Sequence, residues 1–333
     1  MILTVTPNAA LDLTWWVDRI EPGATHRVPS GMARAGGKSL NVARVAHQQG
    51  ATVLAIATAG GTTGAELELE LRASGLPHEL VPVAASTRRS LALYDAGNDE
   101  TSIFNEFGEN HSDTEWRQLL DAVDAALAGA HCLVGSGSLP PGSLASADAG
   151  AGYDSSDFYP ELVRMAAARG IPSIIDTSGT ALLAAADAGA TVLKPNRDEL
   201  IAATDIGDPV RAARSLIARG AGLVLLSLGS AGMIAVGPGD EYLSARLPEP
   251  LVGNPTGAGD AAVAAVASCF AEAGTAPSAE ALSTEQILRR ATAWSAAAVL
   301  MPLAGEISPL HAELAERLIV ERHTVPHATE SPS

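Results

Sequence analysis

Residues 173–227 decide the fold class, because they contain three short apolar runs: Ser173-Ile-Ile-Asp176, Thr191-Val-Leu193 and Leu223-Val-Leu-Leu-Ser227. Helical patterns near 178–187 and 208–219 separate these runs. Strands that alternate with helices in this way favour a parallel sheet that is covered on both faces. Ligands of such sheets bind at the carboxyl ends of the strands, so we expect the functional residues to follow the apolar runs.

The same alternation extends back to the first residues. It predicts strands at Leu3–Thr6, Thr52–Ala57 and His131–Val134, and helices near 39–49, 63–74, 113–128 and 158–169. Residues 12–34 and 87–105 instead show alternating patterns without a helical period, which predicts short antiparallel strands that form a small flap over the sheet edge. We expect one α/β domain over 1–322, a flexible loop at 145–157 and a frayed tail at 323–333.

Composition excludes several classes of protein. The 333 residues are 47% hydrophobic, which excludes a disordered chain, and 21 basic against 38 acidic side chains give a net charge of −17. That charge argues against a nucleic-acid partner, because phosphate neutralisation needs a basic face. No apolar run reaches the ~18 residues that a membrane helix needs. Two cysteines are too few for a disulfide scaffold, and a cytoplasmic location fits them best.

The basic residues are unevenly chosen, since 19 are Arg and only Lys38 and Lys194 are Lys. Lys is a compact point charge and Arg a rigid fork, and the two differ where geometry is tight. The two lysines are therefore candidates for a function, although compositional drift explains them equally well.

The strongest motif is Asn254-Pro-Thr256-Gly257-Ala258-Gly259-Asp260, which runs directly into an apolar helix. The free N–H groups at a helix start, together with the positive end of its dipole, form an anion site. Asp260 would repel an anion there, but it fits a base that faces a hydroxyl attacking a phosphate. The structural alternative is a plain N-cap, for which Asp is a favoured residue.

A second motif, Lys194-Pro-Asn196-Arg-Asp-Glu199, follows a predicted strand and enters a helix. Asn196 and Glu199 stand three residues apart, so both can face one point, and their oxygens suit Mg²⁺. The alternative is a capping box, in which the Asn caps the helix and the Glu reaches back. Both readings can hold together.

Three further segments predict parts of a ligand site. Gly36-Gly37-Lys38-Ser-Leu-Asn41 gathers polar groups at a helix start, but its spacing does not fit a P-loop. Ser227-Leu-Gly229-Ser-Ala-Gly232 is either an ordinary hairpin turn or a cover for a nucleotide. Arg88 and Arg89 place two cations on the flap, as a phosphate clamp or as a solvated pair. A fourth segment, Val134-Gly-Ser-Gly-Ser-Leu-Pro-Pro, begins like a dinucleotide fingerprint but has Pro140 in place of the third glycine. It therefore favours a tight loop that lines the cleft over a Rossmann pyrophosphate site.

Taken together, the motifs resemble the PfkB, or ribokinase-like, family of sugar kinases, in the branch of 1-phosphofructokinase and tagatose-6-phosphate kinase. The resemblance extends from the opening Thr4-Val-Thr-Pro-Asn-Ala-Ala-Leu-Asp12 to about Glu306, and the motifs occur in the family's order. It implies a ribokinase-like three-layer fold with a mostly parallel central sheet and a small antiparallel flap, or lid. It also implies phosphoryl transfer from ATP, with Mg²⁺, to a sugar phosphate.

The resemblance also implies roles for single residues. Asp260 would be the base, and the N–H groups of Gly257, Ala258 and Gly259 the anion hole. The magnesium-associated pair would be Asn196 and Glu199. The sugar phosphate would be held by Asp12, Gly37, Lys38, Asn41 and Arg88, and ATP would lie along Lys194, Ser227, Gly229, Gly232, Thr256 and Gly259.

Substrate identity is less constrained than the reaction. Ser39 stands where the family usually has Gly, and Ser90 where it usually has Asn, and both changes lie on the substrate side. Fructose 1-phosphate is the leading expectation, with tagatose 6-phosphate or fructose 6-phosphate as alternatives. A non-catalytic sugar-phosphate sensor is the alternative from another functional class. The exposed flap strands could pair two subunits into a homodimer.

Overall fold

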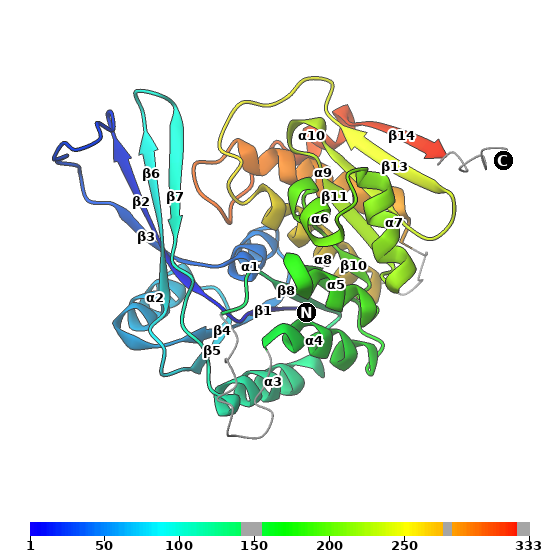
Figure 1. Ribbon diagram of the computed structural model, residues 1–333, viewed down its shortest axis with the longest axis horizontal. Helices are drawn as coiled ribbons and strands as arrows, with labels where there is room; N and C mark the ends of the chain where they lie inside the picture. Colours follow the sequence, from blue (N-terminus) through cyan, green and yellow to red (C-terminus); the bar gives the residue numbers. More distant parts are fainter. Residues whose placement is uncertain (141–154, 276–281, 325–333) are drawn as a thin grey trace.

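The computed structural model describes residues 1–140, 155–275 and 282–324, and its largest feature is a ten-stranded sheet in the order β14-β13-β12-β11-β10-β9-β8-β1-β4-β5 (Figure 1). All pairs from β5 to β11 are parallel, and the β11–β12, β12–β13 and β13–β14 pairs are antiparallel. The strands are β1 (Ile2–Thr6), β4 (Val53–Ala59), β5 (His78–Pro82), β8 (Cys132–Ser136), β9 (Ser173–Asp176), β10 (Val192–Leu193), β11 (Leu223–Ser227), β12 (Met233–Val236), β13 (Glu241–Arg246) and β14 (Ile319–Thr324).

Helices cover both faces of this sheet. One face carries α1 (Lys38–Gln48), α2 (Gly61–Ser74), α8 (Ala258–Thr275), α9 (Thr284–Val299) and α10 (His311–Arg317). The other carries α3 (Asp113–Leu127), α4 (Phe158–Ala167), α5 (Gly179–Asp187), α6 (Arg197–Thr204) and α7 (Pro209–Arg219), with short 3-10 turns at Ser155–Asp157 and Gly229–Ala231. Neighbouring residues on one strand enter opposite cores, as Ile2 and Leu3 do, because side chains alternate along a strand. The predicted three-layer α/β fold is therefore confirmed.

The flap is a separate four-stranded sheet, which stands to the left of the main body in Figure 1. Its order is β3 (Met32–Gly36), β2 (Ala10–Val17), β6 (Arg88–Asp95) and β7 (Glu100–Asn105). The two outer pairs are antiparallel as predicted, but the central β2–β6 pair is parallel. This follows from the connections, since β2 comes after β1 and β6 after β5, and both leave the carboxyl edge of the large sheet.

The structure differs from the predicted bounds of the loop and the tail. Most of the predicted loop at 145–157 lies outside the described residues, and Ser155–Asp157 forms a turn that leads into α4. The expectation that the tail frays from His323 is wrong for its first two residues, because β14 continues to Thr324. There the His323 ring stacks on Tyr242 at 4.7 Å and its Nε2 lies 2.8 Å from the Ser244 hydroxyl.

Among the helices of the described ranges, none combines the length and the apolar character needed to cross a membrane.

Candidate active site

The carboxyl edge of the parallel strands and the flap together enclose a cavity of about 1140 Å³. Successive strand ends of the large sheet supply Thr6, Gly137, Asp176, Lys194 and Ser227 to its lining. Every residue to which the family resemblance assigned a role also lines it: Asp12, Gly37, Lys38, Asn41, Arg88, Lys194, Asn196, Glu199, Ser227, Gly229, Gly232, Thr256, Gly257, Ala258, Gly259 and Asp260. The structure thus brings together segments that are up to about 250 residues apart in the chain, at the place where an open α/β sheet binds ligands.

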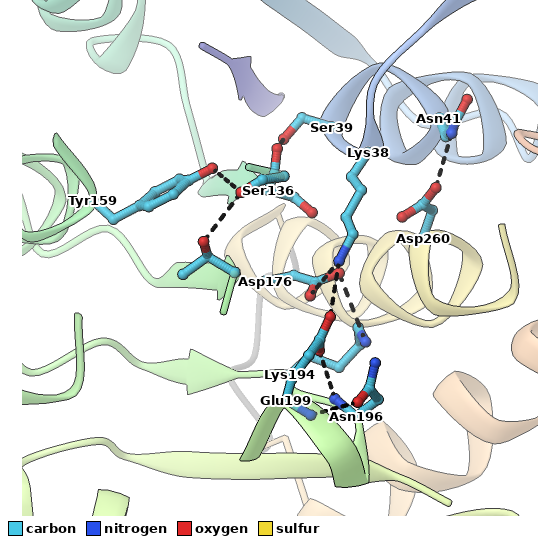
Figure 2. A network of polar contacts seen from close by, with 12 residues as sticks. Lys38, Ser39, Asn41, Ser136, Tyr159, Asp176, Lys194, Asn196, Glu199 and Asp260 are labelled. Carbon is cyan, nitrogen blue, oxygen red and sulfur yellow. Dashed lines mark hydrogen bonds and ion pairs between the residues drawn. The ribbon is translucent and has the colours of Figure 1, made fainter. Parts of the chain in front are cut away.

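Asp260 lies in the first turn of α8 and is almost completely buried. Its Oδ2 accepts a hydrogen bond of 2.8 Å from the Asn41 side-chain amide (Figure 2). Burial raises the pKa of the Asp260 carboxyl to about 7, and the positive charges of Lys38 and Lys194 only partly offset this effect. A carboxyl group that titrates near neutral pH is suited to accept a proton from a hydroxyl group. Asn41, which was expected to hold the sugar, here orients this carboxyl group.

The loop before α8 is fixed by Asn254, whose importance the sequence analysis missed. Its Oδ1 accepts from the Thr256 N–H at 3.0 Å, and its Nδ2 donates to the Pro302 carbonyl at 3.0 Å. Such Asx turns were a readable signal, because Asn bonds its own backbone two residues on. Gly257 has a φ of 84°, and a Cβ there would lie 2.8 Å from the Ala304 Cα, so only glycine fits.

The proposed anion hole is partly engaged in this structure. The Ala258 N–H donates to the Pro255 carbonyl at 3.1 Å, so that group closes a turn rather than facing the cavity. A Cβ on Gly259 would lie 3.2 Å from Lys194 Nζ, so the lysine ammonium approaches this backbone closely because residue 259 has no side chain. The arrangement places a cation beside the start of α8, where an anion would bind.

The Asn196–Glu199 segment forms the capping box that the sequence left open as an alternative. The Asn196 side chain accepts from the Glu199 N–H at 2.8 Å, and Glu199 Oε2 accepts from the Asn196 N–H at 2.9 Å. The other oxygen, Oε1, stays available and lies 3.7 Å from Lys38 Nζ. One Glu199 oxygen therefore caps α6 while the second faces the cavity.

Asp176 is the principal site residue that the sequence analysis did not assign. It ends β9, is 1% exposed, and lies 3.3 Å from Lys38 Nζ through Oδ1 and 3.6 Å from Lys194 Nζ through Oδ2 (Figure 2). The two lysines of the chain thus meet at one carboxylate. The signal was present in the sequence, because Asp176 is the last residue of a strand that was predicted with the correct bounds.

The flap supplies the opposite end of the cavity. Burial raises the pKa of Asp12 to about 6, although the neighbouring cations Arg88, Arg34 and Arg44 oppose that rise. Arg88 lines the cavity and donates to the carbonyl oxygens of Asn8 and Glu106, each at 3.2 Å, whereas the exposed Arg89 does not line it. The two arginines therefore point to opposite faces of β6, as strand alternation predicts.

Arg34 ties the flap to the body of the protein. Its guanidinium donates to the Ala304 carbonyl at 2.9 Å and pairs with Glu306 at 3.0 Å. The sequence gives no local indication of this contact, because its partners lie 270 residues away or more. The same segment approaches Gly257, so the flap and the loop before α8 meet there.

The third region of the cavity lies over β11 and β12. The 227–232 segment connects these antiparallel strands as a hairpin, which was one of the two interpretations of its sequence, and it also supplies residues to the cavity lining. Gly232 has a φ of 91° and packs against the Ala245 carbonyl, which excludes any side chain. Apolar residues complete this part of the wall: Leu247, Pro250, Leu251, Ala296 and Val299.

The residues in the cavity fit a magnesium ion that arrives with a phosphate ligand. Within the parts of the chain that the structure describes, no three His, Cys, Asp or Glu side chains converge to hold a metal by themselves. One carboxylate oxygen of Glu199 is not used by the helix cap, and Glu199 lines the cavity. Mg²⁺ keeps several waters and usually takes one or two carboxylates together with substrate phosphates, which matches this donor set.

Comparison with known proteins places the chain in a family. Residues 8–310 match the pfkB family carbohydrate kinases. A 1-phosphofructokinase from Xanthomonas campestris pv. campestris is 35% identical over 302 residues, which are 88% of this chain and 89% of that protein. An ATP-dependent 6-phosphofructokinase isozyme 2 from Mycobacterium tuberculosis is 34% identical over 271 residues, or 80% of this chain and 76% of that protein.

Comparison with solved structures agrees with the family assignment. The tetrameric inhibited form of phosphofructokinase-2 from Escherichia coli superposes with a TM-score of 0.80 at 30% identity, covering 94% of this chain and 99% of that one. Sequence and fold agree over almost the whole length, and residues 8–310 contain every residue of the cavity lining except Thr6. The chain belongs to the pfkB family of carbohydrate kinases.

Proposed function

We propose that this protein transfers the γ-phosphoryl group of ATP to the 6-hydroxyl of fructose 1-phosphate and forms fructose 1,6-bisphosphate and ADP. The kinase family implies ATP as a substrate. One observation carries the proposal: the buried Asp260, at a helix start, shares its cavity with the nearby Lys38 and Lys194 and with Arg88 on the flap. A ligand with phosphate at its far end suits Arg88, while its hydroxyl end faces Asp260.

In the proposed reaction, the Asp260 carboxylate accepts the hydroxyl proton as the alkoxide oxygen bonds to the γ-phosphorus. The bond from that phosphorus to the bridging oxygen breaks, and ADP leaves with the electron pair. Asn41 keeps the carboxylate aimed, since it donates to Oδ2 at 2.8 Å. The N–H groups of Gly257 and Gly259, with Lys194 beside them, offset the charge on the transferred group.

We propose that Mg²⁺ accompanies ATP and is held from the Glu199 side, through the oxygen that does not cap α6. When bound, the ion neutralises phosphate charge. The residues of this chain then orient the phosphates: Lys38 and Lys194 supply point charges, and the 227–232 turn with the apolar wall near Leu251 surrounds the remainder of the nucleotide.

Tagatose 6-phosphate or fructose 6-phosphate is the alternative acceptor. The relatives are named for both 1-phosphofructokinase and 6-phosphofructokinase activity, so the family does not distinguish these sugars. The non-catalytic sensor is less well supported, because a sensor has no need for a buried carboxyl group with a pKa near 7 at the helix start.

We also propose that two copies pair through their flaps. All six residues of β7 are exposed, and the flap presents the large apolar side chains of Trp16, Ile103 and Phe104. An edge strand with exposed apolar residues is a template for pairing with another chain.

A coupled assay of ADP release tests the acceptor. The panel contains fructose 1-phosphate, fructose 6-phosphate, tagatose 6-phosphate and free fructose, each with ATP and Mg²⁺. We expect the highest kcat/KM for fructose 1-phosphate and little turnover of free fructose. A preference for a 6-phosphate would select the alternative acceptor, and no turnover of any sugar would contradict kinase activity.

A further inference from the structure

The contacts of Asp176 go beyond what a buried structural carboxylate needs. It is 1% exposed at the end of β9, yet each of its oxygens faces a lysine from a different segment of the chain. Lys38 begins α1, and Lys194 directly follows β10. Among the described residues Oδ2 accepts no hydrogen bond, so the ammonium of Lys194 is its main partner.

The two lysines share one anion, which matters most for the buried Lys194. Two ammonium groups that converge on one carboxylate repel each other, and Lys194 is 4% exposed, so water cannot screen it. A lysine side chain is also a flexible four-carbon stem that does not hold one position unaided. Asp176 supplies both the compensating charge and a fixed point, because β9 is paired on both sides within the sheet.

Both lysines that contact Asp176 also lie next to groups with a proposed role in the reaction. Lys194 Nζ lies against Gly259, in the segment proposed as the anion hole. Lys38 Nζ lies between Asp176 and Glu199 and also acts on the charge of Asp260. Figure 2 shows both side chains reaching Asp176 from opposite sides, next to the Asn41–Asp260 pair.

We propose that Asp176 is a positioning residue for phosphoryl transfer, which fixes the ammonium groups of Lys38 and Lys194 beside Asp260 and the start of α8. The inference rests on the proposed function. Asp176 touches neither substrate in this account and acts through the two lysines. A misplacement of charged groups by about 1 Å can lower a rate by about 10²-fold.

The first arm of the test uses the ligand-free protein and does not depend on activity. Because the chain has two lysines, lysine labelled with ¹³C at Cε gives one signal for each, and Lys38→Arg assigns them. We expect both wild-type signals to differ from free lysine, and both to move toward it in Asp176→Asn. Asp187→Asn is the matched control, since it breaks an exposed ion pair with Arg219. Lysine signals that are unchanged in Asp176→Asn, or that already match free lysine in the wild type, would overturn the inference.

The second arm measures kinetics with the full panel of substrates. Asp176→Asn should lower kcat/KM by about 10–100-fold. It should also move the acid limb of the pH profile to lower pH, because the charges around Asp260 are Lys38, Lys194 and Asp176, and the variant removes the negative one. Asp176→Glu restores the charge at a changed distance, so it should recover the position of the limb but not the rate. An acid limb that stays in place in Asp176→Asn indicates a merely structural role and overturns the inference.

The two arms separate the two claims. A protein whose lysine signals respond to Asp176→Asn, but which phosphorylates no sugar, would support the lysine arrangement and contradict the proposed function. An active kinase whose lysine signals and pH profile are the same in the wild type and in Asp176→Asn would support the function and overturn the inference.

Discussion

Asp260 is a carboxyl group placed where its charge is costly. Its pKa of about 7 reflects burial, and the folded protein therefore holds the neutral acid more readily than the unfolded chain does. Catalysis needs the opposite state, since only the carboxylate accepts a proton. The structure thus gives up some stability at the point where chemistry occurs, a trade-off that is frequent at active sites.

Asp260→Asn should lower kcat by ~10²–10⁴-fold, which is the usual value of general-base catalysis. In the wild type, activity should fall as the pH drops below about 7, because the carboxyl group becomes protonated there. Because the pKa of Asp260 is higher in the folded protein than in the unfolded chain, the stability that the neutral carboxyl group contributes is lost as the pH rises through about 7. Asp260→Asn removes this loss, so the Tm of the variant relative to the wild type should be higher at pH 8 than at pH 5.5. Steady-state kinetics and thermal unfolding at both pH values check this, and a variant with near wild-type kcat would remove Asp260 from the mechanism.

Glu199→Gln separates the charge of Glu199 from its capping role. The amide oxygen of Gln can still accept from the Asn196 N–H, so α6 should stay capped and Tm should change by at most a few degrees. The magnesium concentration for half-maximal rate should rise severalfold, with a smaller effect on the KM of the sugar. Glu115→Gln is the matched control, because Ser112 and Glu115 form the same capping box on α3 outside the cavity. Equal magnesium dependence in both variants would leave Glu199 with the capping role alone.

At the scale of elements, the flap orients its side chains by strand alternation. Arg88 faces the cavity and Arg89 does not, although the two are adjacent. This follows from the register of β6 between β2 and β7, where Ala10 pairs with Arg88 and Phe104 with Leu91. A shift of one residue in either ladder would reverse the two arginines.

Arg88→Ala should raise the KM of the sugar phosphate by ~10–100-fold, because charged hydrogen bonds are worth ~1.5–3 kcal/mol and ~1.4 kcal/mol is tenfold. The KM of ATP should barely change, and any activity on free fructose should be unaffected, since that sugar has no phosphate. Arg89→Ala is the control and should have a smaller effect. If neither substitution changes the KM, the acceptor carries no phosphate at this position.

The elements themselves were largely predictable. Strands Ser173–Asp176 and Leu223–Ser227 were predicted with the bounds they have, because short apolar runs between helical patterns carry a strong signal. The parallel β2–β6 pair, the Arg34–Glu306 contact and the convergence of two lysines on Asp176 were not predicted. These features arise from tertiary contacts between distant segments, which no local period or motif spacing reports. The cytoplasmic location stays a prediction from cysteine content.

On the scale of the whole molecule, the net charge affects how the protein binds its ligands, and the exposed apolar surface affects how it binds a second copy of itself. A net charge of −17 opposes the approach of anionic substrates, so the local cations Lys38, Lys194 and Arg88 must reverse the field inside the cavity. The flap presents large apolar side chains next to the open edge of β7.

Phe104→Asp should shift a flap-mediated dimer to monomer, because a charge placed in an apolar contact must be desolvated. Phe104 is 60% exposed on β7, and Leu69, which is 65% exposed on α2, provides a matched control as Leu69→Asp. Sedimentation velocity at several protein concentrations reports the state of each variant. A dimer that survives Phe104→Asp, or a wild-type monomer, would contradict pairing through the flap.

The central claim is that the cavity transfers a phosphoryl group from ATP to a sugar phosphate with Asp260 as the base. The most direct measurement is ³¹P NMR of a mixture of the protein, ATP, Mg²⁺ and fructose 1-phosphate, followed over time. We expect one new phosphomonoester signal on the sugar for each ADP that forms, no inorganic phosphate, and formation of both products that is slower by ~10²–10⁴-fold with Asp260→Asn. ATP that is consumed with release of inorganic phosphate, or an Asp260→Asn protein that makes the same product at the same rate, would contradict the claim.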